Sequence, residues 1–463
     1  MKSHRIFIIG FFTTLGYLFI LYTGWLKFFL LDYAIPSLDL KIILYLLLSA
    51  FWLVLFYCCI YWWRKKINWS KSWRWLIGGV VVFSFILIAT WPLTSSDVFV
   101  YIMQGRILGI YHDNPYQHYL SQYPGDPIQP WIFFRWQNTP VVYGPIWCII
   151  SAGLAIISGL SVIMNLLIFR LFMAVCLGIS IWLFYKILNI VKPEFKYFGT
   201  FLYAWNPLLL FETINNGHND IVMLMLIFLS LYLFLRKKYL AVLPIFILAC
   251  LIKYICILIL PLLIILLLAK QKNKIKFIIQ SIIIILPLLI LCLWPCHWGQ
   301  DLKAGIFFQS GMFWGYYLAP IPGILSGFAK ALWPGMDVFQ RDVMIKTLCT
   351  WMFLFGYVFC LLKFYWQKQF SFIRFNYYVL LIFSGYLLLA CFFLNEWYIV
   401  WLLPWLIIME KKNYFILLVI LTLAALLTSN ILPGSMVFAM ILAACLLLNI
   451  IRHAYKTSRK VYS

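Results

Sequence analysis

Long apolar runs recur from one end of this chain to the other, and they constrain its fold more than any other feature. Many of them have about 15 to 25 residues, the length at which an α-helix crosses the hydrocarbon core of a bilayer. Backbone polar groups find no water partners in lipid, so a crossing segment must satisfy them internally. Because 65% of the residues are hydrophobic and only 11% are charged, the sequence predicts an all-α, polytopic transmembrane helix bundle with about 12 to 14 spans.

Two longer segments interrupt the apolar runs, at 94–144 and 295–345. No polar stretch has the length of a soluble domain, so residues 1–463 are expected to form a single integral-membrane domain with these two segments as outer loops. Residues 98–106 are amphipathic enough to lie in the interface, which predicts interfacial helices in the first outer loop. The run at 6–25 is long and lacks a small-residue cleavage site, so we expect a retained first helix rather than a signal peptide.

The net charge of +23 is spread over short basic clusters between the apolar runs. This distribution is typical of cytoplasmic loops under the positive-inside rule. A nucleic-acid-binding protein would instead carry one contiguous basic face with exposed stacking residues, so we exclude nucleic acid as a partner. The clusters are Arg64–Lys66 with Lys71 and Arg74, Arg236–Lys238, Lys270 to Lys276, Lys411–Lys412, and Arg452 to Lys460.

Charge asymmetry also sets the predicted topology, which is a multi-pass cell-membrane protein with cytoplasmic N- and C-termini. The run at 75–93 then delivers Asp97 to the outer side. Two schemes for the middle of the chain differ in whether 145–159 crosses fully and whether 239–269 crosses once. We adopt the scheme in which 145–159 dips in without crossing and 239–269 is a hairpin that turns at Lys253, because it keeps more basic residues in the cytoplasm. This scheme places the active site on the outer face.

Asp97 follows the third apolar run and opens the first outer loop. Taken alone, an aspartate before an apolar segment is well explained as a helix N-cap. However, Tyr101, Gln104 and Arg106 follow on the same segment and Tyr143 closes the loop, so polar groups can gather beside this carboxylate. We interpret Asp97 as the candidate catalytic group and the other four residues as candidate substrate-binding residues.

A second polar group comes from the stretch N-N-G-H-N-D, which ends with His218, Asn219 and Asp220. Such a stretch makes a good turn and N-cap, yet a plain turn has little need of an imidazole, amides and a carboxylate together. Lys253 lies inside an apolar run, where a charge is costly and its default interpretation is functional, although a lysine can also snorkel from a helix end. Arg170 raises the same question nearer a segment start. We take His218, Asn219, Asp220 and Lys253 as candidate substrate-binding residues.

Trp397 and Tyr398 precede a short apolar segment late in the chain. Both are ordinary residues of a membrane-interface belt, and both also make platforms for a lipid or a sugar face, so they are further candidate substrate-binding residues. The twelve cysteines are scattered without zinc-ligand spacing. No metal ligand is predicted and no cofactor is firmly implied. Two aspartates alone are weak evidence for a metal site, so a divalent cation is neither predicted nor excluded.

Several short motifs follow one another in order between residues 90 and 405: S-D-V-F-V-Y-I-M-Q-G-R from Ser96, N-P-Y from Asn114, Y-G-P from Tyr143, W-N-P-L from Trp205, G-H-N-D from Gly217, Lys253 with Pro261, and W-Y-I-V-W-L-L-P from Trp397. Together they resemble the GT-C class of integral-membrane glycosyltransferases, and in particular the bacterial polyprenol-phosphate-mannose-dependent mannosyltransferases. The resemblance implies that Asp97 is the catalytic base, that Lys253 meets the donor phosphate and that the His-Asn-Asp loop lines the pocket. Glu396 stands where a proline is expected in that pattern, so no role is carried over to it.

The chain has no Gly-rich phosphate loop, Rossmann-type segment or cytosolic domain for a nucleotide sugar. With the resemblance, this implies a polyprenyl-phosphate sugar as donor, a glycan or glycolipid as acceptor, and the lipid bilayer as surroundings. The expected function is inverting transfer of a sugar, mannose by resemblance, to an acceptor hydroxyl with Asp97 as base. One alternative is a transporter or flippase of a lipid-linked sugar, which would favour internal repeats and unwound helices at the midplane. A scaffold subunit with a degenerate site is another.

Overall fold

The computed structural model describes residues 4–30, 40–139, 141–294, 320–367, 370–391, 394–428 and 444. Regular structure in these residues consists of helices, which confirms the all-α prediction. The chain divides into two compact units, Met1–Met312 and Phe313–Ser463. A single domain over residues 1–463 therefore stays a prediction.

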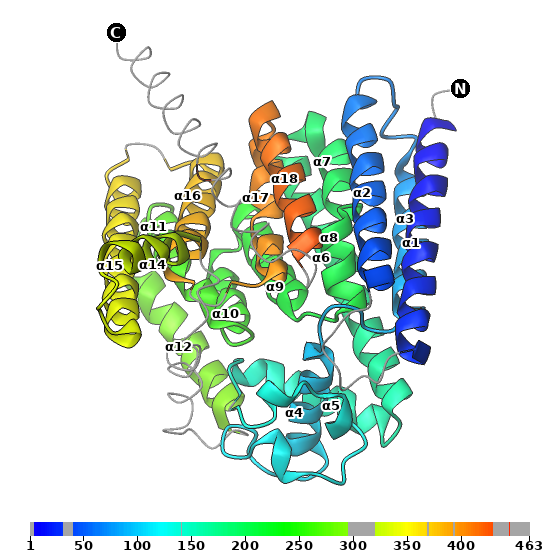
Figure 1. The fold of residues 1–463 in the computed structure, drawn as a ribbon. Helices are drawn as coiled ribbons and strands as arrows, with labels where there is room; N and C mark the ends of the chain where they lie inside the picture. The colour runs from blue at the N-terminus through cyan, green and yellow to red at the C-terminus, as the bar shows by residue number, and fades with distance from the viewer. Residues whose placement is uncertain are drawn as a thin grey trace. The chain divides into compact units, whose positions relative to one another are not determined.

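The first unit opens with three helices, and the first of them packs against both of the others (Figure 1). Their lengths of 27, 23 and 17 residues correspond to about 40, 35 and 26 Å of helix. The helices are α1 His4–Leu30, α2 Leu40–Trp62 and α3 Trp73–Ala89.

The W-N-P-L motif has a structural task in this unit. The indole of Trp205 lies against Gly79 of α3 so closely that an added Cβ would overlap the ring. Its Nε1 donates to the carbonyl of Leu76 at 3.1 Å. Asn206 then caps the next helix, because its Oδ1 accepts from the backbone N–H of Leu209 at 3.1 Å. The motif thus fixes where the following polar segment starts.

The first predicted outer loop is a folded substructure at one end of this unit (Figure 1). That its main helix lies in the membrane interface stays a prediction, and within the protein this helix is buried from Asp97 to Ile107. One reason is that Trp131 from the loop stacks on Phe99 with ring centres 5.9 Å apart. The elements are α4 Asp97–Gly109, η1 Leu120–Gln122, η2 Gln129–Trp131, η3 Phe134–Trp136 and α5 Pro145–Ser158.

Helices α4 and α5 cross closely at small residues. A Cβ added to Gly105 would overlap the backbone of Ser151, and one added to Gly109 would lie 2.9 Å from the carbonyl oxygen of Ala152. The G-x-x-x-G spacing puts both glycines on one face of α4, which lets the two backbones approach each other. The crossing fixes α4, and with it Asp97, against α5.

Gly105→Ala is expected to lower the free energy of unfolding by about 1–3 kcal/mol, because the new methyl group has no space at this crossing. The matched control is Gly153→Ala on α5, where an added Cβ meets nothing within 4 Å. There the better helix propensity of alanine should be neutral or stabilising. Thermal unfolding of the purified variants measures both effects, and equal changes in the two would show that the crossing is not tight.

The middle of the first unit holds the broken helix that carries the N-N-G-H-N-D stretch. The helix axis bends by 117° between Pro207–Asn215 and Asp220–Leu235, and residues 216–219 form the bend. The long helix α6 packs against the second half of this pair. The elements are α6 Val162–Val191, η4 Pro193–Phe195, α7 Lys196–Ala204, α8 Pro207–Leu210, the π-helix η5 Phe211–Asn215 and α9 Asp220–Leu235.

The segment 239–269 turns back on itself, as predicted. Its two ends line one pocket, to which both Lys238 and Lys270 contribute, so the helices between them run out and return. The turn is docked on the start of α5, because the N–H groups of Gly144 and Ile146 donate to the carbonyls of Ile252 and Leu251 at 3.1 Å each. The elements are α10 Tyr239–Cys250, η6 Tyr254–Leu258, α11 Leu260–Leu268 and then α12 Lys274–Leu293.

The second unit is a separate group of helices. Its helix α15 begins at Val338, inside the predicted second outer loop at 295–345, and residues 295–319 of that loop lie outside the described residues. The apolar run at 435–451, which by its length is predicted to be a further membrane span, also lies outside them, apart from residue 444. The elements are α14 Pro320–Leu332, α15 Val338–Tyr365, α16 Phe372–Gly385, η8 Tyr386–Ala390, η9 Glu396–Trp401, α17 Leu403–Met409 and α18 Lys412–Thr428.

The helix lengths confirm a multi-pass membrane protein. Among the described residues, six helices are long and apolar enough to cross a membrane, or seven if the bent pair at 207–235 is one span. Shorter apolar helices, α5 and α10 among them, add to these. With 14 residues, α5 is about 21 Å long, less than the roughly 30 Å of a hydrocarbon core. That 145–159 dips without crossing stays a prediction.

Candidate active site

Arg170 lies at the centre of the contacts that position the chain before Asp97. It is 1% exposed, and its Nη1 donates to the carbonyls of Ile88 at 2.9 Å and Thr90 at 2.6 Å, at the C-terminal end of α3. Its Nη2 donates to the carbonyl of Asn215. A cation at a helix C-terminus satisfies carbonyls that have no partner inside the helix. Arg170 therefore ties the end of α3 to the broken helix.

Asn215 adds to these contacts of Arg170 from the other side, and we call the combined set the clamp. Its Nδ2 donates to the carbonyls of Thr90 at 3.1 Å and Trp91 at 3.2 Å, and its Oδ1 accepts from the N–H of Leu93 at 3.2 Å. The first asparagine of the N-N-G-H-N-D stretch is thus a positioning residue. It holds the segment that leads into Asp97 next to the turn that carries His218.

Arg170→Met is expected to lower the free energy of unfolding by at least about 2 kcal/mol, because it removes the donor from buried carbonyls. Arg236→Met is the matched control, since Arg236 is exposed and donates only to the hydroxyl of Tyr232 among the hydrogen bonds described for its side chain. It should change stability by less than about 0.5 kcal/mol. Thermal unfolding in detergent compares them, and similar losses would contradict the clamp.

His218 lies between two carboxylates in the bend of the broken helix. Its Nδ1 is 3.9 Å from Oδ2 of Asp97, and its Nε2 is 3.2 Å from Oε2 of Glu212. The backbone N–H of His218 also donates to the carbonyl of Glu212 at 3.0 Å. His218 is 1% exposed, Glu212 2% and Asp97 8%. Of these three side chains, that of Asp97 is thus the most exposed.

Glu212 is the residue that the sequence interpretation missed. It lies in the π-helix η5 and accepts a hydrogen bond from Nδ2 of Asn216 at 2.8 Å. Two signals point to it: a carboxylate inside an apolar run is costly and rarely without function, and single π-turns are frequent at functional sites. The first of these signals was readable from L-L-L-F-E-T-I.

Lys253 forms a buried ion pair with Asp220. Its Nζ donates to Oδ1 of Asp220 at 2.7 Å, and the two side chains are 9% and 3% exposed. The same ammonium group lies 5.9 Å from the centre of the Tyr143 ring. The pair connects the hairpin turn with the first residue of α9, so two elements far apart in sequence meet here.

Tyr101 and Tyr143 connect the two acidic positions. The hydroxyl of Tyr101 is 3.3 Å from that of Tyr143 and 3.5 Å from Nδ1 of His218. Burial raises the pKa of both tyrosines well above the usual value, and the negative charges of Asp97 and Asp220 add to that rise. Both phenols therefore keep their protons, and the hydroxyl of Tyr101 donates to that of Tyr143.

The electrostatic environment of Asp97 favours a base. Burial raises the pKa of Asp97 above its ordinary value, while His218, the hydrogen bond from Ser95 and Lys253 act in the opposite direction. A carboxylate with a raised pKa binds a proton more strongly than an exposed one. A chain of contacts through His218, Tyr101 and Tyr143 connects Asp97 with Lys253.

Three other predicted residues have different surroundings. Arg106 was expected beside Asp97, but nine residues of helix put about 13 Å between them. It is buried at 0% exposure, and its Nε and Nη1 donate to Asp126 and to the carbonyl of Gly159, at 2.6 Å each. It therefore holds the segment 94–144 together. Gln104 is 2% exposed, and Asn219, next to His218 and Asp220, is 0% exposed.

Trp397 and Tyr398 belong to the second unit, where they form η9. Tyr398 stacks on Trp401 with ring centres 4.4 Å apart, and Trp397 meets Tyr398 edge-on. Their predicted contact with substrate stays a prediction. No group of three or more His, Cys, Asp and Glu side chains suited to a metal ion occurs within the described ranges.

A multi-pass helical bundle with an acidic group, an imidazole and a lysine gathered at broken helix ends fits the class of GT-C-like integral-membrane glycosyltransferases. The pattern of the MptA_B family, described as alpha-(1→6)-mannopyranosyltransferase, N-terminal domain, matches residues 24–269. This chain belongs to that family. The matched range runs from α1 to the end of the hairpin, and it includes Asp97, Glu212, His218, Asp220 and Lys253.

One similar protein is alpha-(1→6)-mannopyranosyltransferase A of Corynebacterium glutamicum. It is 28% identical to this chain over 161 residues, which are 34% of this chain and 31% of the relative. The chain therefore matches about a third of that relative's length.

Proposed function

We propose that this protein transfers a mannosyl residue from a polyprenyl-phosphate donor to a hydroxyl group of a glycan or glycolipid acceptor. Membership of a mannopyranosyltransferase family supports the sugar and the reaction class. The observation that carries the proposal is the cluster itself, in which contacts through His218, Tyr101 and Tyr143 connect the carboxylate of Asp97 with the buried cation Lys253. A base and a cation in one cluster suit attack by a hydroxyl and departure of a phosphate.

Asp97 acts on the acceptor in this proposal. Its carboxylate takes the proton of the acceptor hydroxyl as that oxygen forms a bond to the anomeric carbon of the donor. The bond from the anomeric carbon to the phosphate oxygen breaks at the same time, and both electrons leave with the phosphate. One displacement inverts the anomeric configuration. His218 lies beside the carboxylate and orients it, and the neutral Tyr101 lies within 3.5 Å of the same imidazole nitrogen.

Lys253 acts on the leaving group. A fixed ammonium stabilises the negative charge that grows on the phosphate in the transition state. Asp220 holds the ammonium in place through the ion pair of 2.7 Å, and the ring of Tyr143 lies 5.9 Å from the same group. The phosphate leaves without being protonated, so the reaction needs no general acid.

The proposal places the reaction on the outer face of the membrane, with both termini in the cytoplasm. The basic clusters support this orientation, because they occur in other segments of the chain than the site residues and the positive-inside rule assigns such clusters to the cytoplasm. Lys253 follows the end of α10, about 18 Å along the helix from the lysines at its start.

Membrane vesicles that contain the protein, given radiolabelled polyprenyl-phosphate mannose and an acceptor extract, test the proposed function. Label is expected in a new glycosidic bond, and transfer should survive solubilisation in detergent. A nucleotide-activated mannose is the control donor and should give no product without an added lipid-charging enzyme. Movement of the labelled lipid across the membrane without a new bond would support a transporter instead and refute the proposal.

A further inference from the structure

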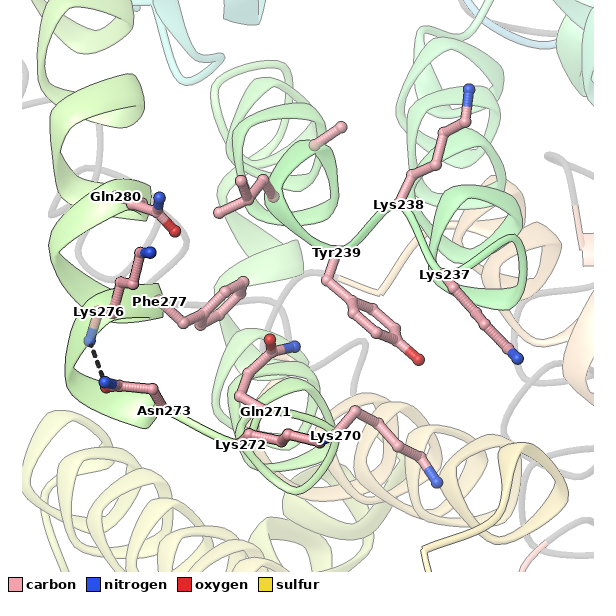
Figure 2. Close-up of a pocket in the computed structure, with 12 residues that line it drawn as sticks. Lys237, Lys238, Tyr239, Lys270, Gln271, Lys272, Asn273, Lys276, Phe277 and Gln280 are labelled. Carbon is pink, nitrogen blue, oxygen red and sulfur yellow. Dashed lines mark hydrogen bonds between the residues drawn. The ribbon is translucent and has the colours of Figure 1, made fainter.

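A pocket lies at the base of the hairpin (Figure 2). It has a volume of about 620 Å³, within the range of small-molecule sites. Its lining comes from the α9–α10 connection and from the α11–α12 connection, with the rings of Tyr239 and Phe277 between them. The pocket begins at the start of α10, whereas Lys253 follows its end.

The charged residues that line this pocket are all lysines. No carboxylate is among its twelve lining residues, and Gln271, Asn273 and Gln280 add only uncharged polar groups. Helices α10 and α12 both start at the pocket, so the positive ends of two helix dipoles add to the charge. Like charges gathered in one concave place attract an anion. The lysines are Lys237, Lys238, Lys270, Lys272 and Lys276.

The apolar surroundings indicate that the anion belongs to a lipid. Helix α12 carries two of the lining residues, Lys276 and Phe277, in its first turn. The same helix also presents exposed isoleucines: Ile275 is 72% exposed, Ile279 52% and Ile283 64%. Acyl chains pack against such a face, while a free phosphate ion gains nothing from it.

We propose that this pocket binds the phosphate headgroup of an anionic phospholipid whose acyl chains lie along the isoleucines of α12. Under the positive-inside rule the lipid belongs to the cytoplasmic leaflet. Basic pockets between transmembrane helices are a suitable place for anionic headgroups. The bound headgroup joins the two ends of the hairpin whose turn carries Lys253. The assignment is independent of the sugar-transfer chemistry at that turn.

The purified full-length protein in neutral detergent tests the proposal. The rise in unfolding temperature on titration with short-chain phosphatidylglycerol gives the affinity, and short-chain phosphatidylcholine of equal chain length is the control lipid. The triple variant K237Q/K270Q/K276Q is expected to bind phosphatidylglycerol about 100-fold more weakly, since each lysine contributes roughly fivefold. The matched control R64Q/K65Q/K66Q removes the same charge from the α2–α3 connection and should bind within about threefold of the unchanged protein.

Three results would overturn the proposal. Phosphatidylcholine binding as tightly as phosphatidylglycerol would show an apolar site without headgroup recognition. Competition by inorganic phosphate at equal concentration would show a site for a soluble anion. Equal losses in the two triple variants would show a general charge effect.

Two measurements keep the test valid if the glutamine variant fails to fold. The charge-conserving variant K237R/K270R/K276R is expected to bind phosphatidylglycerol within about threefold of the unchanged protein. Raising the salt to about 0.5 M should weaken binding by the unchanged protein at least tenfold, because partly exposed charges are screened. Binding that is insensitive to salt would contradict the role of the lysines.

Discussion

Replacing Asp97 by Asn is expected to lower the rate of mannosyl transfer by about 10²–10⁴-fold, the usual contribution of a general base. The amide keeps the size of the side chain, and it removes only the ability to take a proton. The rate is measured with radiolabelled donor in detergent, at donor concentrations that saturate both proteins. His218 keeps its place beside the amide, so the affinity for the donor should change little.

The same substitution should leave the unfolding temperature at neutral pH equal or raise it. Burial raises the pKa of Asp97 in the folded state, so its contribution to stability is fully present below the pKa of the unfolded chain. That contribution is lost as the pH rises through the folded pKa. At neutral pH the folded protein therefore holds a carboxylate at a cost, and a neutral amide escapes that cost. Functional groups are often kept at the expense of stability in this way.

Asp126→Asn is the control for this prediction. Asp126 is 2% exposed and accepts from Nε of Arg106 at 2.6 Å, so its loss leaves a buried guanidinium without its ion-pair partner. That variant should unfold at a lower temperature. If Asp97→Asn behaved like Asp126→Asn, or kept the full transfer rate, Asp97 would be a structural residue and not a base.

Lys253→Met is expected to lower the free energy of unfolding by about 3–5 kcal/mol, because it leaves the carboxylate of Asp220 buried without its cation. Transfer should fall as well, since the leaving phosphate loses the charge that stabilises it. Chemical denaturation of the purified variant measures the first effect, and the labelled-donor assay measures the second.

The double variant Lys253→Met with Asp220→Leu separates the two effects. Replacing a buried ion pair by apolar side chains of similar size is often neutral or stabilising, so most of the lost stability should return. Transfer should stay lost. Recovery of transfer along with stability would show that the pair only supports the fold.

The convergence of distant residues could be predicted to a useful extent from the sequence. The basic clusters set which ends of the apolar runs share a side, and this placed Asp97, His218 and Lys253 on one face. The turn at Lys253 follows from the same rule, and the structure has that turn docked on Gly144. Hydrophobic length likewise predicted a multi-pass helical bundle.

Other parts depend on contacts that no local pattern shows. The pairing of Arg106 with Asp126 closes a loop of 20 residues, and periodicity carries no information about such a partner. Glu212 lies in a π-helix and contacts His218, and such a departure from 3.6 residues per turn cannot be read from apolar periodicity. Arg170 was a weaker candidate than Lys253 for a functional charge inside an apolar run, but its partners are carbonyls at the end of α3.

The dependence of the single-turnover transfer rate on pH, measured in the unchanged protein and in Asp97→Asn, tests the central claim most directly. The rate of the unchanged protein is expected to fall on the acid side as Asp97 gains its proton, with a midpoint above the ordinary range for aspartate, because burial raises the pKa of this group. The small residual rate of Asp97→Asn should show no such fall. An Asp97→Asn protein that keeps both the rate and the acid limb would contradict the account, since some other group would then take the proton.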